Sequence, residues 1–263
     1  MPILSIMFHD VVEEDRWDSS GFPGGSAALY KLSRKEFEKH LDAIHAVLPP
    51  GSVKTINDLD HGFDQRCVFL TFDDGGICAH TIIADLLEQR GWRGHFFIPT
   101  LYIGTPGFLT VEHLVDLHRR GHIIGSHSSS HPTRITSLSD QRIADEWRES
   151  VRTLSQILGT KVTSASMPQG YYSRRLLEAA REAGIRTAFT SDPTMRVGEI
   201  SGCITLGRYM VQRGMDSRIS AELAQMRFSA RFRQATLWKL KRVAKMASGD
   251  VYIRVREHLL SDK

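Results

Sequence analysis

The sequence predicts an α/β fold in which short apolar strands alternate with longer amphipathic helices. This alternation implies parallel strands, arranged in an α/β barrel or in an open wound sheet. The length of 263 residues suits one large domain or two small ones, and a content of 41% hydrophobic and 24% charged residues is typical of a globular chain. The predicted strands are Ile3–Phe8, Val68–Phe72, His95–Ile98, Ile123–Gly125, Thr187–Thr190 and Ile204–Leu206.

Two helices can be placed from their end signals. Ser33, with Glu36 three residues later, predicts a capping box, and apolar residues follow at helical spacing as far as Leu48. A second helix is expected from about Ser139 to Leu158. Gly159 should end it, because glycine readily takes the left-handed conformation found just after helices.

The chain changes character in two segments. Residues 13–30 contain glycine, serine and proline and are predicted to form a loop. From about Gly214 the strand patterns end, so we expect a main domain over residues 1–214 and a basic helical extension over residues 215–263. Such an extension either rests on anionic lipid or packs on its own domain with a solvated basic face, and the second arrangement is more common. It mixes apolar with basic residues: Phe232, Leu237, Leu240, Val243 and Ala244 with Lys239, Lys241, Arg242 and Lys245.

Charge and cysteine content favour a reducing compartment. The formal net charge of +4 gives no reason to expect nucleic acid as a partner. The three cysteines are odd in number and lack zinc-finger spacing, which favours buried thiols. No apolar run approaches the ~18–20 residues of a membrane span, and the first ten residues do not resemble a signal peptide. We therefore expect a cytoplasmic protein, peripheral to the inner face of the membrane if the extension binds lipid.

Two adjacent carboxylates end the second predicted strand. Asp73 and Asp74 follow Phe72 and precede Gly75 and Gly76. In an α/β fold the carboxyl ends of parallel strands form the functional face. Neighbouring carboxylates that point into one site need a cation or a shared proton to relieve their repulsion. Taken alone, an Asp-Asp-Gly sequence is more often an ordinary turn.

Two histidines follow another strand four residues apart. His127 and His131 enclose three serines, and two imidazoles at this spacing can converge on one ion. With one Asp they match a three-ligand catalytic zinc site, which leaves a position open for water. The alternative is a pair of solvated loop histidines. The carboxylates at a second strand end favour metal binding.

These motifs resemble those of the polysaccharide deacetylases, the NodB-homology domain of carbohydrate esterase family 4. TFDDG and HSSSH, the latter preceded by GHIIGS, look like the first two motifs of that family. The segments GHFFIPT and PQGYYSRRLLEAAREAGIRTAFTSD also resemble the family, so the resemblance runs from about Val68 to Asp192. It implies a distorted (β/α) barrel with fewer than eight units.

The resemblance implies specific roles for the matching residues. Asp74, His127 and His131 would bind one divalent metal ion, usually zinc, and Asp73 would be the general base. The backbone N–H of Gln169 would stabilise the oxyanion. The reaction would remove an acetyl group from an N-acetylated sugar and yield acetate and a free amine.

The sequence departs from the family at two positions. Ser166 stands where the family has an arginine that orients the base, and Arg208 lies in the stretch where the family has its acid histidine. His9 at the end of the first strand resembles the N-terminal acid of the poly-N-acetylglucosamine deacetylase branch. Arg208 would then replace the missing arginine or bind an anionic group of the substrate. Asp192, at another strand end, is a further candidate to face the site.

Three functions remain open from the sequence. The leading one is a metal-dependent N-deacetylase acting on an amino sugar in a glycan or in a nucleotide- or lipid-linked glycan precursor. The second is a hydrolase of another small amide, since the same water-activating site can serve it. The third is a catalytically inactive protein that binds glycan or membrane, which the departures at Ser166 and Arg208 keep open.

Overall fold

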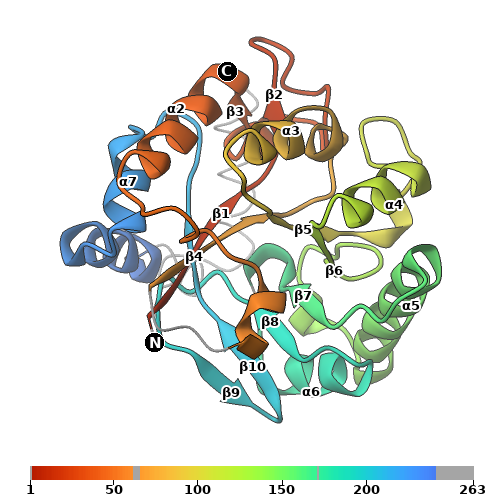
Figure 1. The fold of residues 1–263 in the computed structure, drawn as a ribbon. Helices are drawn as coiled ribbons and strands as arrows, with labels where there is room; N and C mark the ends of the chain where they lie inside the picture. Colours follow the sequence, from red (N-terminus) through yellow and green to blue (C-terminus); the bar gives the residue numbers. More distant parts are fainter. Residues whose placement is uncertain (1, 62–65, 171, 241–263) are drawn as a thin grey trace.

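The computed structural model describes residues 2–61, 66–170 and 172–240. Its main sheet has the strand order β11-β1-β4-β5-β6-β7-β8-β10-β9, and every neighbouring pair is parallel except β10 with β9. Helices surround the strands (Figure 1). The strands are β1 Ile3–Phe8, β4 Cys67–Phe72, β5 His95–Ile98, β6 Ile123–Ser126, β7 Ser164–Ser166, β8 Thr187–Phe189, β9 Gly198–Ile200, β10 Cys203–Leu206 and β11 Arg208–Met210.

A bent strand closes the sheet into a barrel. β10 pairs with β8, whereas β11, which begins two residues after β10 ends, pairs with β1 at the other edge of the sheet. Gly207 stands at the bend, where a Cβ atom would lie 2.4 Å from the carbonyl oxygen of Asp192. When β10 and β11 are taken as one bent strand, seven parallel strands form the barrel. The predicted barrel with fewer than eight units is confirmed.

All six predicted strands are present, with ends that differ by at most one residue. β7 was not predicted, because its three residues, Ser-Ala-Ser, carry no apolar pattern. The segment 13–30 is mostly irregular but contains the short helix α1, Gly25–Ala28. A separate two-stranded sheet, β2 Val11–Val12 with β3 Leu32–Ser33, joins the two ends of that segment.

The predicted start of the first helix and both ends of the second are confirmed, whereas the first helix ends at His45, three residues before Leu48. α2, Arg34–His45, begins with the capping box of Ser33 and Glu36. α5, Asp140–Leu158, is capped by Ser139 and ends at Gly159, which has a φ of 66°. The other helices of the barrel are α3 Ala84–Glu88, α4 Val111–Arg119 and α6 Arg174–Glu182.

The described part of the extension is helical. α7, Arg218–Ala224, packs against α2, where the side chains of His40 and Ser220 share a hydrogen bond of 2.7 Å. Residues 228–240 form a further helix. Val243, Ala244 and the basic residues Lys241, Arg242 and Lys245 lie outside the described residues. None of the helices in the described ranges is long and apolar enough to cross a membrane.

Candidate active site

The candidate site forms at the carboxyl ends of β1, β4 and β6, with β5 lying between β4 and β6 in the sheet. Asp73 and Asp74 follow β4, and His127 follows β6. His9 follows β1, which pairs with β4 so that Phe8 lies opposite Phe72. The backbone N–H of Asp73 donates to the carbonyl oxygen of Phe8 at 3.2 Å. Parallel pairing therefore brings His9, the two carboxylates and His127 to the same edge of the barrel.

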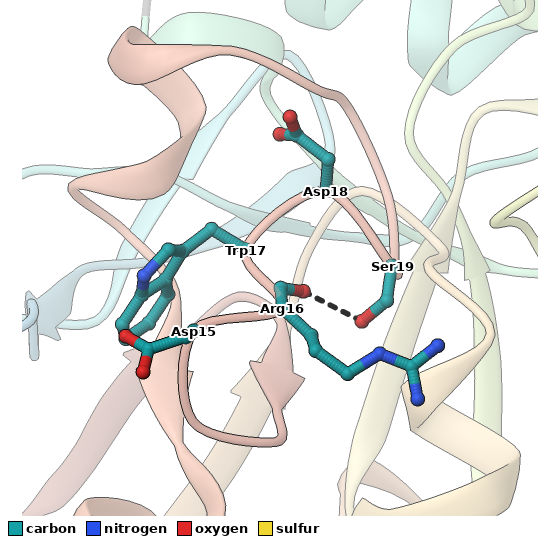
Figure 2. Close-up of a pocket in the computed structure, with 5 residues that line it drawn as sticks. All are labelled: Asp15, Arg16, Trp17, Asp18 and Ser19. Carbon is teal, nitrogen blue, oxygen red and sulfur yellow. Dashed lines mark hydrogen bonds between the residues drawn. The ribbon is translucent and has the colours of Figure 1, made fainter.

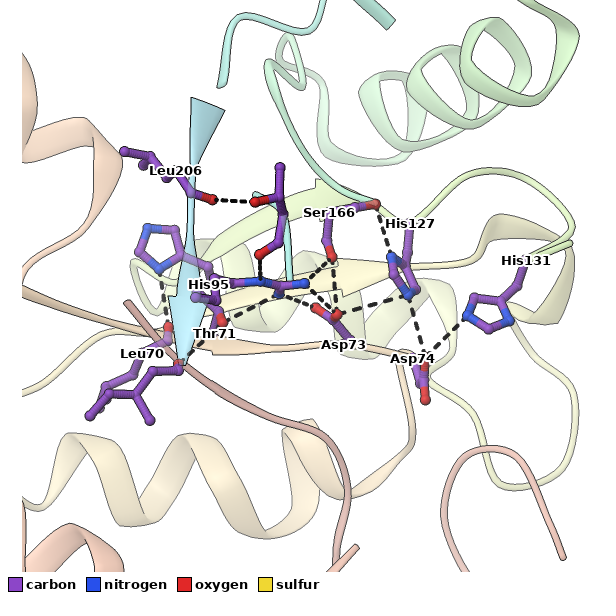
Figure 3. A network of polar contacts seen from close by, with 12 residues as sticks. Leu70, Thr71, Asp73, Asp74, His95, His127, His131, Ser166 and Leu206 are labelled. Atoms are coloured by element: carbon purple, nitrogen blue, oxygen red, sulfur yellow. Dashed lines mark hydrogen bonds and ion pairs between the residues drawn. The ribbon is translucent and has the colours of Figure 1, made fainter. Parts of the chain in front are cut away.

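Asp74, His127 and His131 converge as a metal-ligand set (Figure 3). The Oδ1 atom of Asp74 lies 3.4 Å from Nε2 of His127 and 3.5 Å from Nε2 of His131. One donor atom from each residue lies within 4.8 Å of the other two. One carboxylate and two imidazoles fit a divalent ion such as zinc, with a coordination position left for water.

His127 is held with the correct nitrogen facing Asp74. Its Nδ1 donates a hydrogen bond of 3.0 Å to the carbonyl oxygen of Ser166. In the neutral ring this leaves the lone pair on Nε2, the nitrogen nearest Asp74. Burial alone would lower the pKa of His127, but the charges of Asp73 and Asp74 outweigh it and raise that pKa.

The other two ligands are kept in their metal-binding protonation states. Burial, and to a smaller extent His127, lowers the pKa of His131 to about 4, although Asp74 opposes this, so the ring is neutral at pH 7. Burial would raise the pKa of Asp74, but its contacts with His127 and His131 outweigh burial and hold that pKa well below its usual value. A neutral imidazole and an ionised carboxylate are the forms that bind metals.

The site concentrates unusual backbone conformations. Asp74, Ser128, His131 and Gln169 all have positive φ values, between 52° and 74°. Positive φ is uncommon outside glycine and costs about 1–3 kcal/mol where the residue is poorly suited to it. Four of the seven such residues in the described chain lie in the candidate site or its neighbouring motif. The surrounding structure therefore maintains these conformations against a local cost.

A buried glutamate on α5 supports the loop between the two histidines. The Glu146 carboxylate accepts hydrogen bonds from the backbone N–H groups of Ser129 and Ser130, at 2.9 and 2.8 Å, and from the Ser130 hydroxyl. Ser128 Oγ accepts from the N–H of His131 at 3.1 Å. Glu146 is absent from the site residues that the sequence predicts. Its position on the apolar stripe of α5, next to Trp147, was the signal that could have found it.

Asp73 is bound by Arg208, the first residue of β11. Arg208 Nη1 and Nη2 donate to the two carboxylate oxygens of Asp73 at 2.7 and 2.9 Å. Ser166 Oγ donates to Asp73 at 3.0 Å and accepts from Arg208 at 2.7 Å. Because the Arg208 side chain has no solvent exposure, this geometry favours orientation of Asp73 over capture of an anionic substrate group.

The ion pair also sets the charge of Asp73. Burial would raise the pKa of this carboxyl group, but the charges of Arg208 and His127 and the hydrogen bonds from Arg208 outweigh burial, so the pKa is lowered. Asp73 is therefore ionised at neutral pH. Its Oδ2 atom lies 4.0 Å from Nε2 of His127, beside the metal-ligand set but not part of it.

His9 lies beside the carboxylates but is not bonded to the neighbouring Asp10. The side chain of Asp10 instead accepts hydrogen bonds from Ser20 and Cys78. The His9 ring packs at 4.9 Å against the ring of Tyr30. Its buried Nδ1 has no hydrogen-bond partner among the described residues. His9 is near enough to lower the pKa values of both Asp73 and Asp74.

Gln169 and Asp192 occupy different surroundings. Gln169 has a φ of 55° inside the short turn Pro168–Gly170, and it is exposed. The Asp192 carboxylate accepts a hydrogen bond from the Tyr172 hydroxyl, and its backbone oxygen accepts from the N–H of Arg208. Asp192 therefore contacts Tyr172 and the backbone of Arg208, the first residue of β11, rather than the metal ligands.

The irregular segment 13–30 forms one wall of the site. The Phe22 ring lies 4.8 Å from the ring of His131 and also contacts the rings of Tyr102 and Phe108. A separate surface cavity of about 400 Å³ in the same segment is lined by Asp15, Arg16, Trp17, Asp18 and Ser19 (Figure 2). That cavity contains none of the candidate site residues.

Comparison with known proteins agrees with this geometry. Residues 60–188 match the family model described as polysaccharide deacetylase. YxkH of Bacillus subtilis, which is described as a polysaccharide deacetylase, is 26% identical to this chain. The match covers 70% of this chain and 67% of YxkH. The peptidoglycan-N-acetylmuramic acid deacetylase PdaA of Bacillus subtilis is 29% identical over 54% of this chain. The match covers 56% of the length of PdaA.

A solved structure shares the fold. The Streptococcus pyogenes deacetylase PplD in complex with acetate superposes with a TM-score of 0.69 at 17% identity, covering 82% of this chain and 95% of PplD. Residues 60–188, which hold both motifs, therefore form a polysaccharide deacetylase domain, and the barrel agrees with that assignment.

Proposed function

We propose that this protein is a divalent-metal-dependent hydrolase that removes an N-acetyl group from an amino sugar of a glycan or glycan precursor. The observation that carries the proposal is the convergence of Asp74, His127 and His131 beside the ionised Asp73. Family membership supports hydrolysis of an amide bond. The donor set, one carboxylate and two imidazoles, supports zinc as the ion.

The bound ion would supply Lewis acidity, which lowers the pKa of a water molecule and polarises the acyl oxygen. Asp73 would take the proton of the attacking water. Arg208 and Ser166 hold this carboxylate in one orientation and keep it ionised. A general base must be held in a fixed orientation towards the proton that it takes, and the ion pair supplies that fixed orientation.

Two further groups would complete the reaction. The backbone N–H of Gln169 would donate to the oxygen that becomes negatively charged when water attacks. His9 would give a proton to the leaving amine nitrogen, so that the C–N bond breaks and acetate and a free amine form. The position of His9 at the end of β1, next to β4, supports this assignment.

The Asp73–Arg208 pair bears on the inactive-protein alternative. The departures at Ser166 and Arg208 leave that alternative open in the sequence. In the structure both side chains donate hydrogen bonds to Asp73, which supports Arg208 as the cation that orients the base. We therefore favour an active enzyme.

Acetate release from oligomers of N-acetylglucosamine tests the proposed function. The wild-type protein should release acetate, a chelator should abolish the release and added zinc should restore it. Asp73→Asn should be inactive, whereas Asp145→Asn, on the outer part of α5, should match wild type. Equal acetate release by Asp73→Asn and wild type would overturn the assignment of the base.

A further inference from the structure

The helix at residues 228–240 carries an unpartnered apolar face. Phe228 is 71% exposed, Phe232 59%, Leu237 50% and Leu240 62%. They are four of the eight exposed large hydrophobic residues in the described chain. Scattered apolar residues are normal on a protein surface, but a cluster on one element indicates an interaction site.

The opposite side of this helix is attached to the barrel. Ala230 is 3% exposed, and Gln234 Nε2 donates a hydrogen bond of 3.1 Å to the carbonyl oxygen of Met210 at the end of β11. The exposed positions recur as 228/229, 232/233, 236/237 and 239/240, the spacing of one helical face. Packing on the domain therefore leaves the face that holds the two stacked rings, Phe228 and Phe232, turned outward.

In the segment of the sequence that contains this helix, every charged side chain is positive. Between Glu222 and Asp250 the sequence has seven basic residues and no acidic one, whereas the rest of the chain has a net charge of −3, since the whole carries +4. Arg233 and Lys239 are exposed among the apolar side chains in the described part of this segment. A helix that presents aromatic and aliphatic side chains together with cations binds at the interface of an anionic bilayer.

We propose that the helix at residues 228–240 docks this protein on an anionic phospholipid surface. The rings of Phe228 and Phe232 would enter the headgroup region, as would Leu240 about two turns further along the helix, while Arg233 and Lys239 would contact lipid phosphates. A symmetric contact between two copies of this helix is disfavoured, because it would bring two strongly basic segments together. The proposal is independent of the deacetylase activity.

Vesicle co-sedimentation of the full chain tests the proposal. Wild-type protein should bind vesicles of phosphatidylcholine mixed with phosphatidylglycerol and should bind pure phosphatidylcholine vesicles much less. Phe228→Ser/Phe232→Ser should weaken binding at least about tenfold. The matched control Val111→Ser/Val197→Ser, which removes apolar residues 42% and 45% exposed elsewhere, should bind like wild type.

A second pair of variants tests the charge contribution. Arg233→Glu/Lys239→Glu should weaken binding about tenfold or more, and Arg148→Glu/Arg174→Glu, which reverses two exposed arginines on other helices, should change it little. Unfolding curves check that each variant is folded. Equal vesicle binding by wild type and Phe228→Ser/Phe232→Ser would overturn the proposal. So would a dimer in light scattering that only those two substitutions dissociate.

Discussion

Arg208 and Asp73 form a two-pronged ion pair with donor–acceptor distances of 2.7 and 2.9 Å, although 135 residues separate them in the chain. Both side chains are almost completely buried. The pair joins the bent strand that closes the barrel to the strand that carries both candidate carboxylates. The arginine that orients the proposed base therefore comes from the strand that closes the barrel.

Loss of Asp73 should affect stability as well as activity. Asp73→Asn leaves the buried Arg208 without its counter-charge, which should lower the free energy of unfolding by about 3–5 kcal/mol. The double variant Asp73→Asn/Arg208→Met removes both charges and should regain most of that loss without regaining activity. Urea unfolding and acetate release, measured on both variants, check this.

This comparison separates the chemical role of Asp73 from its structural one. Recovery of activity in the stable double variant would show that Asp73 is needed only for folding, and would contradict its role as the base. Asp145→Asn provides the control for an Asp→Asn change at a position away from the site.

The pH dependence of activity should respond to Arg208. Burial favours the protonated form of Asp73, and the Arg208 charge is the largest of the effects that lower the pKa of this carboxyl group. In Arg208→Met the pKa of Asp73 should rise, so the base is protonated up to a higher pH. The acid limb of the kcat/KM profile should therefore move to higher pH than in wild type. An acid limb at the same pH in both proteins would mean that it reports another group.

Removal of His9 should slow the reaction without removing the metal. His9→Ala should lower turnover by about 10²–10⁴, the usual effect of losing a general acid, while metal content stays at the wild-type level. Steady-state acetate release and metal analysis measure the two quantities. His80→Ala, which removes a histidine that contacts Asp116 on α4, is the control. Wild-type turnover in His9→Ala would require a different proton donor.

Glu146 should influence metal affinity from outside the ligand set. Glu146→Gln replaces a buried carboxylate that accepts two backbone N–H groups of the loop between His127 and His131. We expect metal affinity to fall about 10–100-fold, as for other residues that orient ligands. A competition assay with a chelator of known affinity measures it, with the exposed Glu149→Gln as control. Unchanged affinity would show that the serines hold the loop without Glu146.

The sequence predicts the local features of this molecule better than the distant contacts. The β4 strand and its two carboxylates are adjacent in the chain, and so are β6 and the HSSSH loop, so pattern and spacing suffice to find them. The residues of β7, Ser-Ala-Ser, contain no such pattern, and the strand forms because β6 and β8 pair with it on either side.

The partner of Asp73 illustrates what the sequence leaves open. From the sequence, Arg208 can either orient the base or bind an anionic group of the substrate, and only the folded barrel shows that its guanidinium is buried against Asp73 and Ser166. The extension contacts its own domain through α7 and Ala230, yet its helix at residues 228–240 leaves Phe232, Leu237 and Leu240 exposed, which the sequence does not predict. The cytoplasmic location and the domain boundary at residue 214 stay predictions.

The metal content of the purified protein tests the central claim most directly. About one divalent metal ion per chain in wild type and in His80→Ala, with loss of the ion in His127→Ala, is the result that we predict. His127→Ala should remain folded in a thermal unfolding experiment, so that loss of metal reports loss of a ligand. A protein that takes up no metal after incubation with zinc, or a His127→Ala variant that binds as much as wild type, would contradict the three-ligand site.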